Sequence, residues 1–194
     1  MNTKLRIAVL VGSLRAESIN RRLALALARL APQASFEHLA MGELPLFNQD
    51  HESHPHEAVS RLKREIEAAD ALLFVTPEYN RSIPGVLKNA IDHGSRPYGK
   101  NSFAGKPAGV IGASVGAIGT AIAQQHLRTV LAYLDMPTLG QPEAFIHFSD
   151  GLIDAGGAIG KESTAQFLTN WMNTYLAWVA AVRDGRSAGK ADKR

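Results

Sequence analysis

The 194-residue sequence contains no cysteine. This absence excludes disulfide bonds, thiolate nucleophiles and metal sites with cysteine ligands. The sequence also lacks an apolar run long enough to span a membrane, since its longest runs are residues 23–28 and 177–182. The apolar residues 7–11 are too few for the hydrophobic region of a signal peptide. We therefore expect a cytoplasmic protein without membrane segments.

An excess of one charge is also missing from most of the chain. Lys and Arg number 21 and Asp and Glu number 18, which gives a formal net charge of +3. The last twelve residues carry that whole excess, with Arg183, Arg186, Lys190, Lys193 and Arg194 against Asp184 and Asp192. The remaining body is neutral and is not expected to bind nucleic acid. We therefore divide the chain into a folded domain, residues 1–182, and a basic, disordered tail, residues 183–194.

Apolar runs typical of buried strands alternate with amphipathic segments typical of helices. The expected strands cover residues 5–11, 35–39, 71–76, 108–113 and 145–148. The expected helices cover residues 19–30, 58–69, 84–93, 118–134 and 163–182. This alternation predicts an α/β fold with right-handed crossovers. The expected architecture is a flavodoxin-like doubly wound five-stranded parallel sheet, of order 2-1-3-4-5, with helices on both faces.

In such a sheet, ligands bind beyond the carboxyl ends of the strands, where the strand order reverses. Three loops are expected to meet there: residues 12–18, 77–83 and 114–118. The first loop leads from a strand into the N-terminus of a helix, where free backbone N–H groups and the helix dipole favour an anion. Arg15 adds a positive group suited to a phosphate. The first loop therefore predicts a site for a phosphorylated small molecule.

The second loop is bracketed by Pro77 and Pro84, which restrict its backbone. Between them it offers an aromatic ring, an amide and backbone N–H groups, a combination that suits a flat heteroaromatic ligand with polar edges. The alternative is an ordinary strand-to-helix turn with Pro84 at the first helical position. The residues of this loop leave both interpretations open.

The third loop allows a different chemistry. Residues 112–119 do not form the G-x-G-x-x-G dinucleotide fingerprint, but residues 112–116 match the G-x-S-x-G pattern of serine hydrolases, with Ser114 as nucleophile. Asp135 and His147 follow in the order that such hydrolases use. Against this alternative, the sequence has no HGGG-type oxyanion motif, and the first two loops stay unexplained.

Two further motifs do not carry a function. Residues 155–162 resemble a phosphate-binding P-loop, but Ala155 and Glu162 stand where Gly and Ser or Thr are required. His51, His54 and His56 form a tract that could bind a transition metal. Because Pro55 breaks helical spacing and the segment is polar, we interpret the tract as an exposed loop and predict no metal site.

Three blocks together resemble a known family: Gly12–Arg15 with Ser18 and Asn20, Thr76–Asn80 with Ser82, and Pro84–Asp92. In these blocks the chain is similar to the NADPH-dependent FMN reductases. It resembles more closely the flavodoxin-like quinone, chromate and azo reductases of bacteria. The resemblance covers about residues 5–180.

The resemblance implies a bound FMN at the meeting point of the three loops. The residues expected to hold its phosphate are Ser13, Arg15, Ser18 and Asn20. The residues expected to contact its ring are Pro77, Glu78, Tyr79, Asn80 and Ser82 on one side, and Ser114 and Gly116 on the other. Arg81 would place a cation beside the ring, where relatives often carry a neutral or aromatic residue.

The resemblance also implies the reaction. NADPH or NADH would reduce FMN, and FMN would reduce a small-molecule electron acceptor: a quinone, or chromate, an azo compound, a ferric chelate or free flavin. We name no catalytic side chain, because the cofactor carries the hydride and the protein supplies position and electrostatics. A homodimer or homotetramer is expected. The alternative within this fold is a flavodoxin-type electron carrier without nicotinamide activity, which Arg15 and the neutral body disfavour.

Overall fold

The computed structural model describes residues 4–191. Five strands form one sheet: β1 (Arg6–Val11), β2 (Ser35–His38), β3 (Ala71–Val75), β4 (Ala108–Ser114) and β5 (Phe145–His147). Every neighbouring pair is parallel, and the order across the sheet is β2-β1-β3-β4-β5. The predicted order, 2-1-3-4-5, is confirmed.

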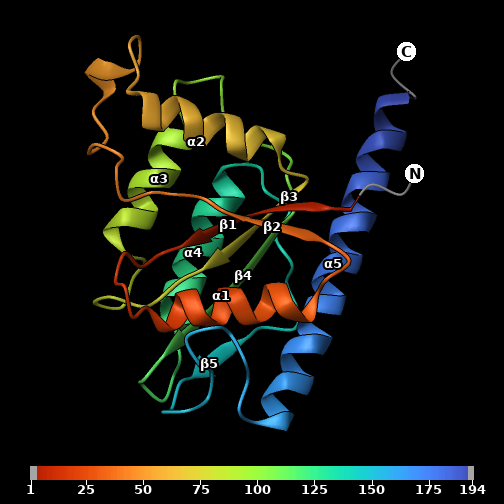
Figure 1. Cartoon of the computed structure of the whole chain (residues 1–194). Helices are drawn as coiled ribbons and strands as arrows, with labels where there is room; N and C mark the ends of the chain where they lie inside the picture. The colour runs from red at the N-terminus through yellow and green to blue at the C-terminus, as the bar shows by residue number, and fades with distance from the viewer. Residues whose placement is uncertain (1–3, 192–194) are drawn as a thin grey trace.

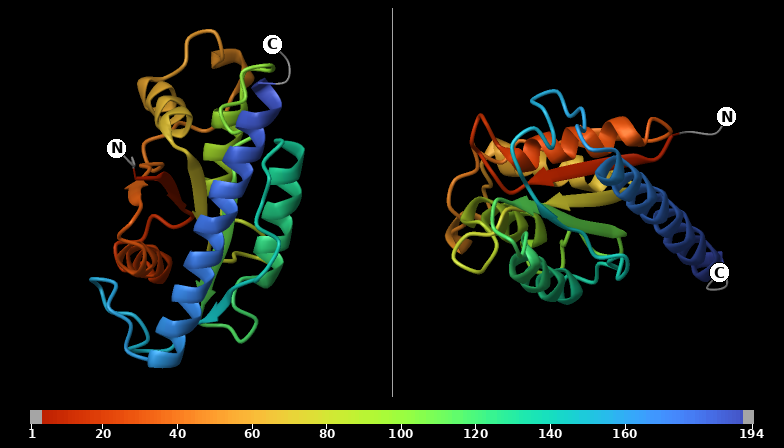
Figure 2. Two further views of the ribbon diagram at one scale, coloured as in Figure 1. Left: turned by 90° about the vertical axis from the view of Figure 1, so that its right-hand side faces the viewer. Right: turned by 90° about the horizontal axis from the view of Figure 1, so that it is seen from below.

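Helices cover both faces of the sheet, as Figures 1 and 2 show. One face carries α1 (Ile19–Leu30) and α5 (Glu162–Ala191). The other carries α2 (Glu57–Ala68), α3 (Gly85–Ser95) and α4 (Ala121–Tyr133). A short 3₁₀ helix (Gln49–His51) interrupts the long connection from β2 to α2. This arrangement is the doubly wound α/β fold expected from the sequence.

The central strand β3 shows why the fold forms. All five of its residues are buried, and successive side chains point to opposite faces of the sheet. Leu73 and Val75 contribute to the core beneath α1 and α5, whereas Leu72 and Phe74 contribute to the core beneath α2, α3 and α4. A continuous apolar run is therefore required here, because both faces of this strand are covered.

The terminal helix α5 continues to Ala191, beyond its predicted end at residue 182. Arg183 forms an ion pair with Asp70 at 3.1 Å, and the guanidinium group of Arg186 lies against Gly105. These contacts tie the helix to the loops that precede β3 and β4. Residues 192–194 lie outside the described residues, and the division of the chain at residue 182 stays a prediction.

Within the described part of the chain, none of the helices combines the length and hydropathy that a membrane span requires.

Candidate functional site

The three loops singled out in the sequence meet at one edge of the sheet. In the register of the central strands, Val11 lies beside Val75, which lies beside Ile111, so β1 and β3 end at the same level and β4 continues for three residues, to Ser114. The Gly12 N–H donates to the Val75 carbonyl at 2.9 Å, and the Thr76 N–H donates to the Ile111 carbonyl at 3.0 Å. The first two loops therefore start next to each other, and the third starts at the same edge, beyond the extra residues of β4.

Gly12 brings the first two loops into direct contact. A Cβ atom at this position would lie 3.1 Å from Cδ of Pro77 and 3.2 Å from Cγ of Pro84. Such distances are tighter than most real Cβ contacts. A glycine is therefore favoured where the first loop crosses the two prolines of the second.

The first loop presents an open, positive helix N-terminus. Ser18 is the N-cap of α1, and its buried hydroxyl accepts the Arg21 N–H at 3.2 Å. The first turn of α1 contains no acidic residue, and Glu17, just before it, pairs with Arg22 at 2.6 Å. Within residues 4–186, the exposed Arg15 makes no ion pair or side-chain hydrogen bond. The dipole of α1 and one free guanidinium group therefore face the same loop.

Ser13 belongs to the same loop as Arg15. Its N–H donates to the Val11 carbonyl at 2.8 Å, its residue is half-buried, and its hydroxyl has no partner among the described residues. A free hydroxyl, free helix N–H groups and an unpaired arginine are the donors that a phosphate requires. The first loop thus fits the phosphate of FMN.

Asn20 has a different position from the one expected of a phosphate ligand. Its side chain is buried, its Nδ2 donates to the Ala113 carbonyl at 2.8 Å, and its Oδ1 accepts the Ala113 N–H at 2.9 Å. The amide therefore fastens α1 to the end of β4. At most one N–H of Asn20 is left for a ligand.

The second loop contains a tight turn. Tyr79 and Ser82 exchange two backbone hydrogen bonds of 3.0 Å, and the residues between them, Asn80 and Arg81, have φ angles of 51° and 63°. Two positive φ angles in succession are typical of a type I′ turn. Asn tolerates this conformation, whereas for Arg81 it costs about 1 kcal/mol. The turn leaves the side chains of Tyr79 and Arg81 exposed.

Glu78 is committed to a neighbouring helix. Its side chain is only 9% exposed, and its Oε2 accepts the N–H groups of Ile122 at 3.0 Å and Ala123 at 3.1 Å. Thr120, the N-cap of α4, makes no side-chain cap bond. Glu78 therefore caps α4 from a distant part of the chain and occupies the positive end of that helix.

A second bond ties the same loop to α4. The Ser82 hydroxyl lies 3.1 Å from Nδ1 of His126, one turn beyond the residues that Glu78 caps. Because the loop is fastened at both Glu78 and Ser82, the turn between them is held against α4. The proposed ring-binding residues are thus positioned by this helix.

The third loop closes the same edge. The Ser114 hydroxyl accepts the Gly116 N–H at 3.0 Å, and the Ser114 carbonyl accepts the Phe148 N–H at 2.8 Å. Gly119 has a φ angle of 60°, which delays α4 until Ala121 rather than the expected residue 118. The first two contacts hold Ser114 and Gly116 beside the end of β5.

The geometry excludes the serine hydrolase alternative. His147 lies beside Ser114 in the register of β4 and β5, but the Asp135 carbonyl accepts the Gly105 N–H just before the opposite end of β4. The seven residues of β4 separate the two ends by about 20 Å. Asp135 cannot orient a histidine beside Ser114, so no catalytic triad forms from these residues.

Sequence reasoning missed the role of Asn89, which belongs to the third resemblance block. Its Oδ1 accepts the Phe47 N–H and its Nδ2 donates to the Pro45 carbonyl, both at 2.8 Å. It therefore anchors the long connection after β2 to α3.

Among residues 4–191, no group of three or more His, Asp or Glu side chains could hold a metal ion, and the histidine tract is no exception.

A Glu78→Ala variant is expected to weaken FMN binding about 10-fold, because loss of a charge-assisted cap of roughly 1–2 kcal/mol releases the second loop from α4. Glu78→Gln keeps an acceptor oxygen and is expected to recover most of the affinity. Fluorescence titration of the apoprotein with FMN measures both constants.

Asp154→Ala is the matched control, since Asp154 Oδ1 also accepts two backbone N–H groups, those of Gly156 and Ala158, in a loop after β5. Its FMN affinity is expected to stay within about 2-fold of the parent, as the small effect of a distant site requires. If the Glu78→Ala variant bound FMN as tightly as the control, Glu78 would not position the second loop.

Over most of its length the chain is similar to known proteins. The family model for NADPH-dependent FMN reductase matches residues 5–151. The chain is 54% identical over 176 residues to the 2-hydroxy-1,4-benzoquinone reductase of a Burkholderia species, covering 90% of this chain and 96% of that one. It is 47% identical over 175 residues to a quinone reductase of Pseudomonas putida, covering 89% and 94%.

A solved structure is similar in both sequence and fold. It is FerB, the flavoenzyme NAD(P)H:(acceptor) oxidoreductase from Paracoccus denitrificans, with a TM-score of 0.88 and 44% identity. The match covers 91% of this chain and 98% of that chain.

Proposed function

Because this chain belongs to the NADPH-dependent FMN reductase family and is an FMN-dependent NAD(P)H oxidoreductase, we propose that quinones are the acceptors it reduces. The relatives at 54% and 47% identity, which span nearly the whole chain, are named as quinone reductases. The single observation in this structure that supports FMN as the cofactor is the open N-terminus of α1 beside the unpaired Arg15.

We propose that Ser13, Arg15 and the N-terminus of α1 behind Ser18 bind the FMN phosphate. Asn20 would contribute at most its one remaining N–H. The residues proposed to contact the flavin ring are Pro77, Glu78, Tyr79, Asn80, Ser82, Ser114 and Gly116. Glu78 would act there through its backbone, since its carboxylate is bonded to α4.

When bound, FMN accepts a hydride from NADPH or NADH and delivers reducing equivalents to the acceptor. The protein's contribution is electrostatic and positional: the positive end of α1 and Arg15 neutralise the phosphate, and the α4-anchored turn orients the ring. Tyr79 is 47% exposed, which leaves one side of the proposed ring site accessible to a flat acceptor.

We also propose that the protein forms a homodimer or homotetramer. Tyr98 and Tyr133 are 87% and 85% exposed, and large exposed aromatic side chains are typical of association surfaces. The positive charge of Arg96 lies close to Tyr133. Sedimentation of the holoenzyme measures the oligomeric state.

A cytoplasmic location stays a prediction.

The function is tested by anaerobic reduction. The purified protein is expected to be yellow, NADPH is expected to bleach it within seconds, and added benzoquinone is expected to restore the colour. Titration with limiting NADPH gives the number of electrons accepted per flavin. Yellow protein that NADPH does not bleach would indicate the flavodoxin-type carrier instead, and colourless protein that takes up no FMN would overturn the cofactor assignment.

A further inference from the structure

A cleft of 690 Å³ lies outside the site described above, between residues 45–56, α2 and the end of α3. None of its lining residues belongs to the three loops at the edge of the sheet. Figure 1 shows the long connection before α2 rising away from α1 and from those loops. We propose that this cleft is a second small-molecule site, which binds a flat aromatic anion. Its volume lies within the range of small-molecule sites in proteins.

One part of the lining is apolar and aromatic. It consists of Pro45, Phe47, Pro55, Val59 and Pro97. The Phe47 ring packs edge-on against His93, with ring centroids 5.4 Å apart and an interplanar angle of 76°. Three prolines and a fixed aromatic pair form stiff walls, which suit a rigid planar ring more than a flexible chain.

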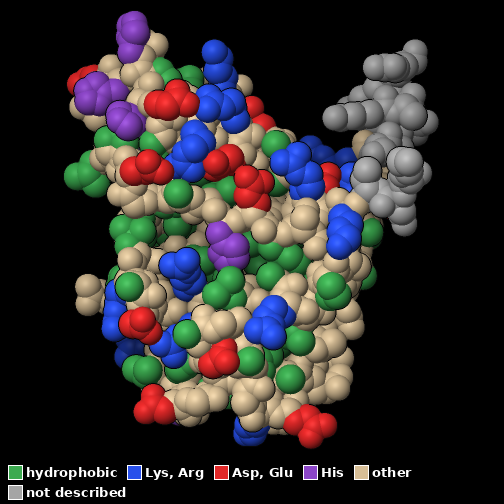
Figure 3. All heavy atoms as spheres, viewed as in Figure 1, with side chains coloured by type: hydrophobic (Ala, Val, Ile, Leu, Met, Phe, Trp, Pro, Cys, Tyr) green, Lys and Arg blue, Asp and Glu red, His purple; other side chains and the backbone are tan. Residues whose placement is uncertain are grey.

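The rest of the lining has more basic than acidic side chains. It includes the four basic side chains Lys63, Arg64, Arg96 and Lys100 and the two carboxylates Glu52 and Glu67, together with four histidines, His51, His54, His56 and His93. The two carboxylates in the lining are already bonded: Glu52 accepts from Nε of Arg96 at 2.6 Å, and Glu67 accepts from the Ser102 hydroxyl at 2.7 Å. Figure 3 shows histidine, Lys and Arg side chains at this end of the molecule, with Asp and Glu side chains among them. A ligand of complementary charge is therefore an anion.

Two basic side chains in the cleft have N–H donors that are not hydrogen-bonded in the described part of the chain. Arg96 uses its Nε for Glu52, which leaves its terminal NH₂ groups, and Lys100 makes no side-chain bond within residues 4–186. Lys63, in contrast, donates to the carbonyls of Gly94, Arg96 and Lys100 at 3.1, 2.7 and 2.7 Å. Burial lowers the pKa of the Lys63 ammonium group. An anion nearby would favour its charged form.

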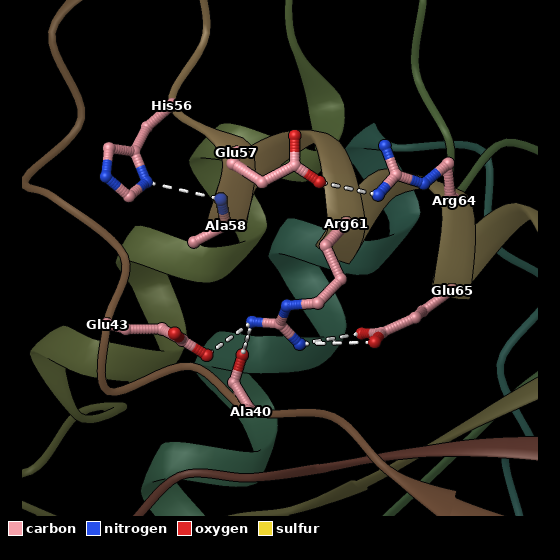
Figure 4. A network of polar contacts seen from close by, with 8 residues as sticks. All are labelled: Ala40, Glu43, His56, Glu57, Ala58, Arg61, Arg64 and Glu65. Carbon is pink, nitrogen blue, oxygen red and sulfur yellow. Dashed lines mark hydrogen bonds and ion pairs between the residues drawn. The ribbon is translucent and has the colours of Figure 1, made fainter.

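The walls of the cleft are fixed before any ligand binds. Asn89 holds the backbone of Pro45 and Phe47 on α3, as described above. Arg61 holds the start of the same connection, donating to the Ala40 carbonyl and to Glu43 at 2.9 Å each, as Figure 4 shows.

The end of the connection is fixed as well. His56 Nδ1 accepts the Ala58 N–H at 3.2 Å and so caps α2, and Arg64 pairs with Glu57 at 2.8 Å (Figure 4). Little ordering is therefore required on binding, which favours affinity.

The absence of cysteine makes a direct test possible. In Ser60→Cys, on the α2 wall of the cleft, the introduced thiol is the sole thiol of the chain. In the FMN-saturated holoenzyme, saturating 2-naphthoate is expected to slow its reaction with a disulfide reagent at least about 5-fold. Ser163→Cys, at the start of α5 and outside this cleft, is the matched control and is expected to react at an unchanged rate.

Calorimetry of the holoenzyme measures affinity and charge preference. We expect one 2-naphthoate per chain and about 10-fold weaker binding of the neutral 2-naphthamide, the loss typical of one charge-assisted hydrogen bond. Lys100→Gln and Phe47→Ala are each expected to weaken 2-naphthoate binding about 5- to 10-fold. Lys161→Gln, a lysine outside the cleft, is expected to leave it unchanged.

Four outcomes of the experiments with 2-naphthoate overturn the proposal. They are binding of 2-naphthoate to the FMN-free protein alone, equal affinity for the neutral amide, indifference to both cleft variants, and a Ser60→Cys thiol that reacts at the same rate with and without 2-naphthoate. The first would place the probe in the flavin site. A thiol that never reacts would show that a second copy of the chain covers the cleft, which also excludes the proposed ligand.

Discussion

A Ser13→Ala, Arg15→Ala double variant is expected to bind FMN about 100- to 1000-fold more weakly than the parent while staying folded. Arg15 would contribute a charge-assisted hydrogen bond of about 1.5–3 kcal/mol to the phosphate, and the Ser13 hydroxyl about 1 kcal/mol more. Neither side chain has a partner within residues 4–186, so their removal leaves no buried group there unpaired. Fluorescence titration of the apoprotein with FMN measures the loss.

The control for this variant is on the same helix. Arg29 lies in the last turn of α1 and donates to the Gly156 carbonyl at 3.0 Å. Arg29→Ala removes the same charge from the opposite end of α1 and is expected to leave FMN affinity within about 2-fold. A thermal melt of each apoprotein checks the fold. If the double variant retained stoichiometric FMN, the phosphate would have to lie elsewhere.

If the phosphate lay elsewhere, the N-terminus of α3 would be the next position to test. The N-cap of α3, Pro84, makes no side-chain cap bond, and the first turn of α3 contains no acidic residue. The positive end of α3 is therefore open at the same edge of the sheet, whereas that of α4 is occupied by Glu78. If the phosphate bound at α3, substitutions in the second loop would weaken FMN binding, and substitutions of Ser13 and Arg15 would not.

The sheet order could be predicted because it depends on local patterns. Each buried strand is a short apolar run, each crossover is a helix, and right-handed crossovers leave few ways to order five strands. The start of α4 could not be predicted so well. Residues 118–120 fit the helical pattern, but Gly119 has a positive φ angle and the first helical N–H groups are capped by Glu78, which is 44 residues away from Ile122 along the chain.

The same distinction between local patterns and distant contacts applies to the candidate site. The loops and their small, polar residues could be predicted because strand ends in a parallel sheet converge. The direction of Asn20 and Glu78 could not, because both side chains bond to the backbone of distant segments. Residue type alone does not distinguish an amide that binds a ligand from one that satisfies buried backbone groups, since both uses require the same donors and acceptors.

Asn20→Ala separates those two uses. The side chain satisfies both the N–H and the carbonyl of Ala113 in a buried position, and each group left without a partner costs about 1–3 kcal/mol. The free energy of unfolding is expected to fall by about 3–5 kcal/mol, which is a large share of the stability of a typical domain. FMN affinity per folded molecule is expected to change less than about 10-fold, because at most one N–H of Asn20 is available to the phosphate.

Urea unfolding of the apoprotein measures this effect free of ligand linkage, since bound FMN would itself raise the apparent stability. Asn170→Ala is the control, because Asn170 is exposed and bonds only the exposed Gln166 through its side chain among the described residues. Its unfolding free energy is expected to stay within about 0.5 kcal/mol of the parent. If Asn20→Ala left the apoprotein as stable as this control but abolished FMN binding, Asn20 would be a ligand of the phosphate. The bond to Ala113 would then be a minor contact, and the junction of α1 and β4 would be held by the apolar core alone.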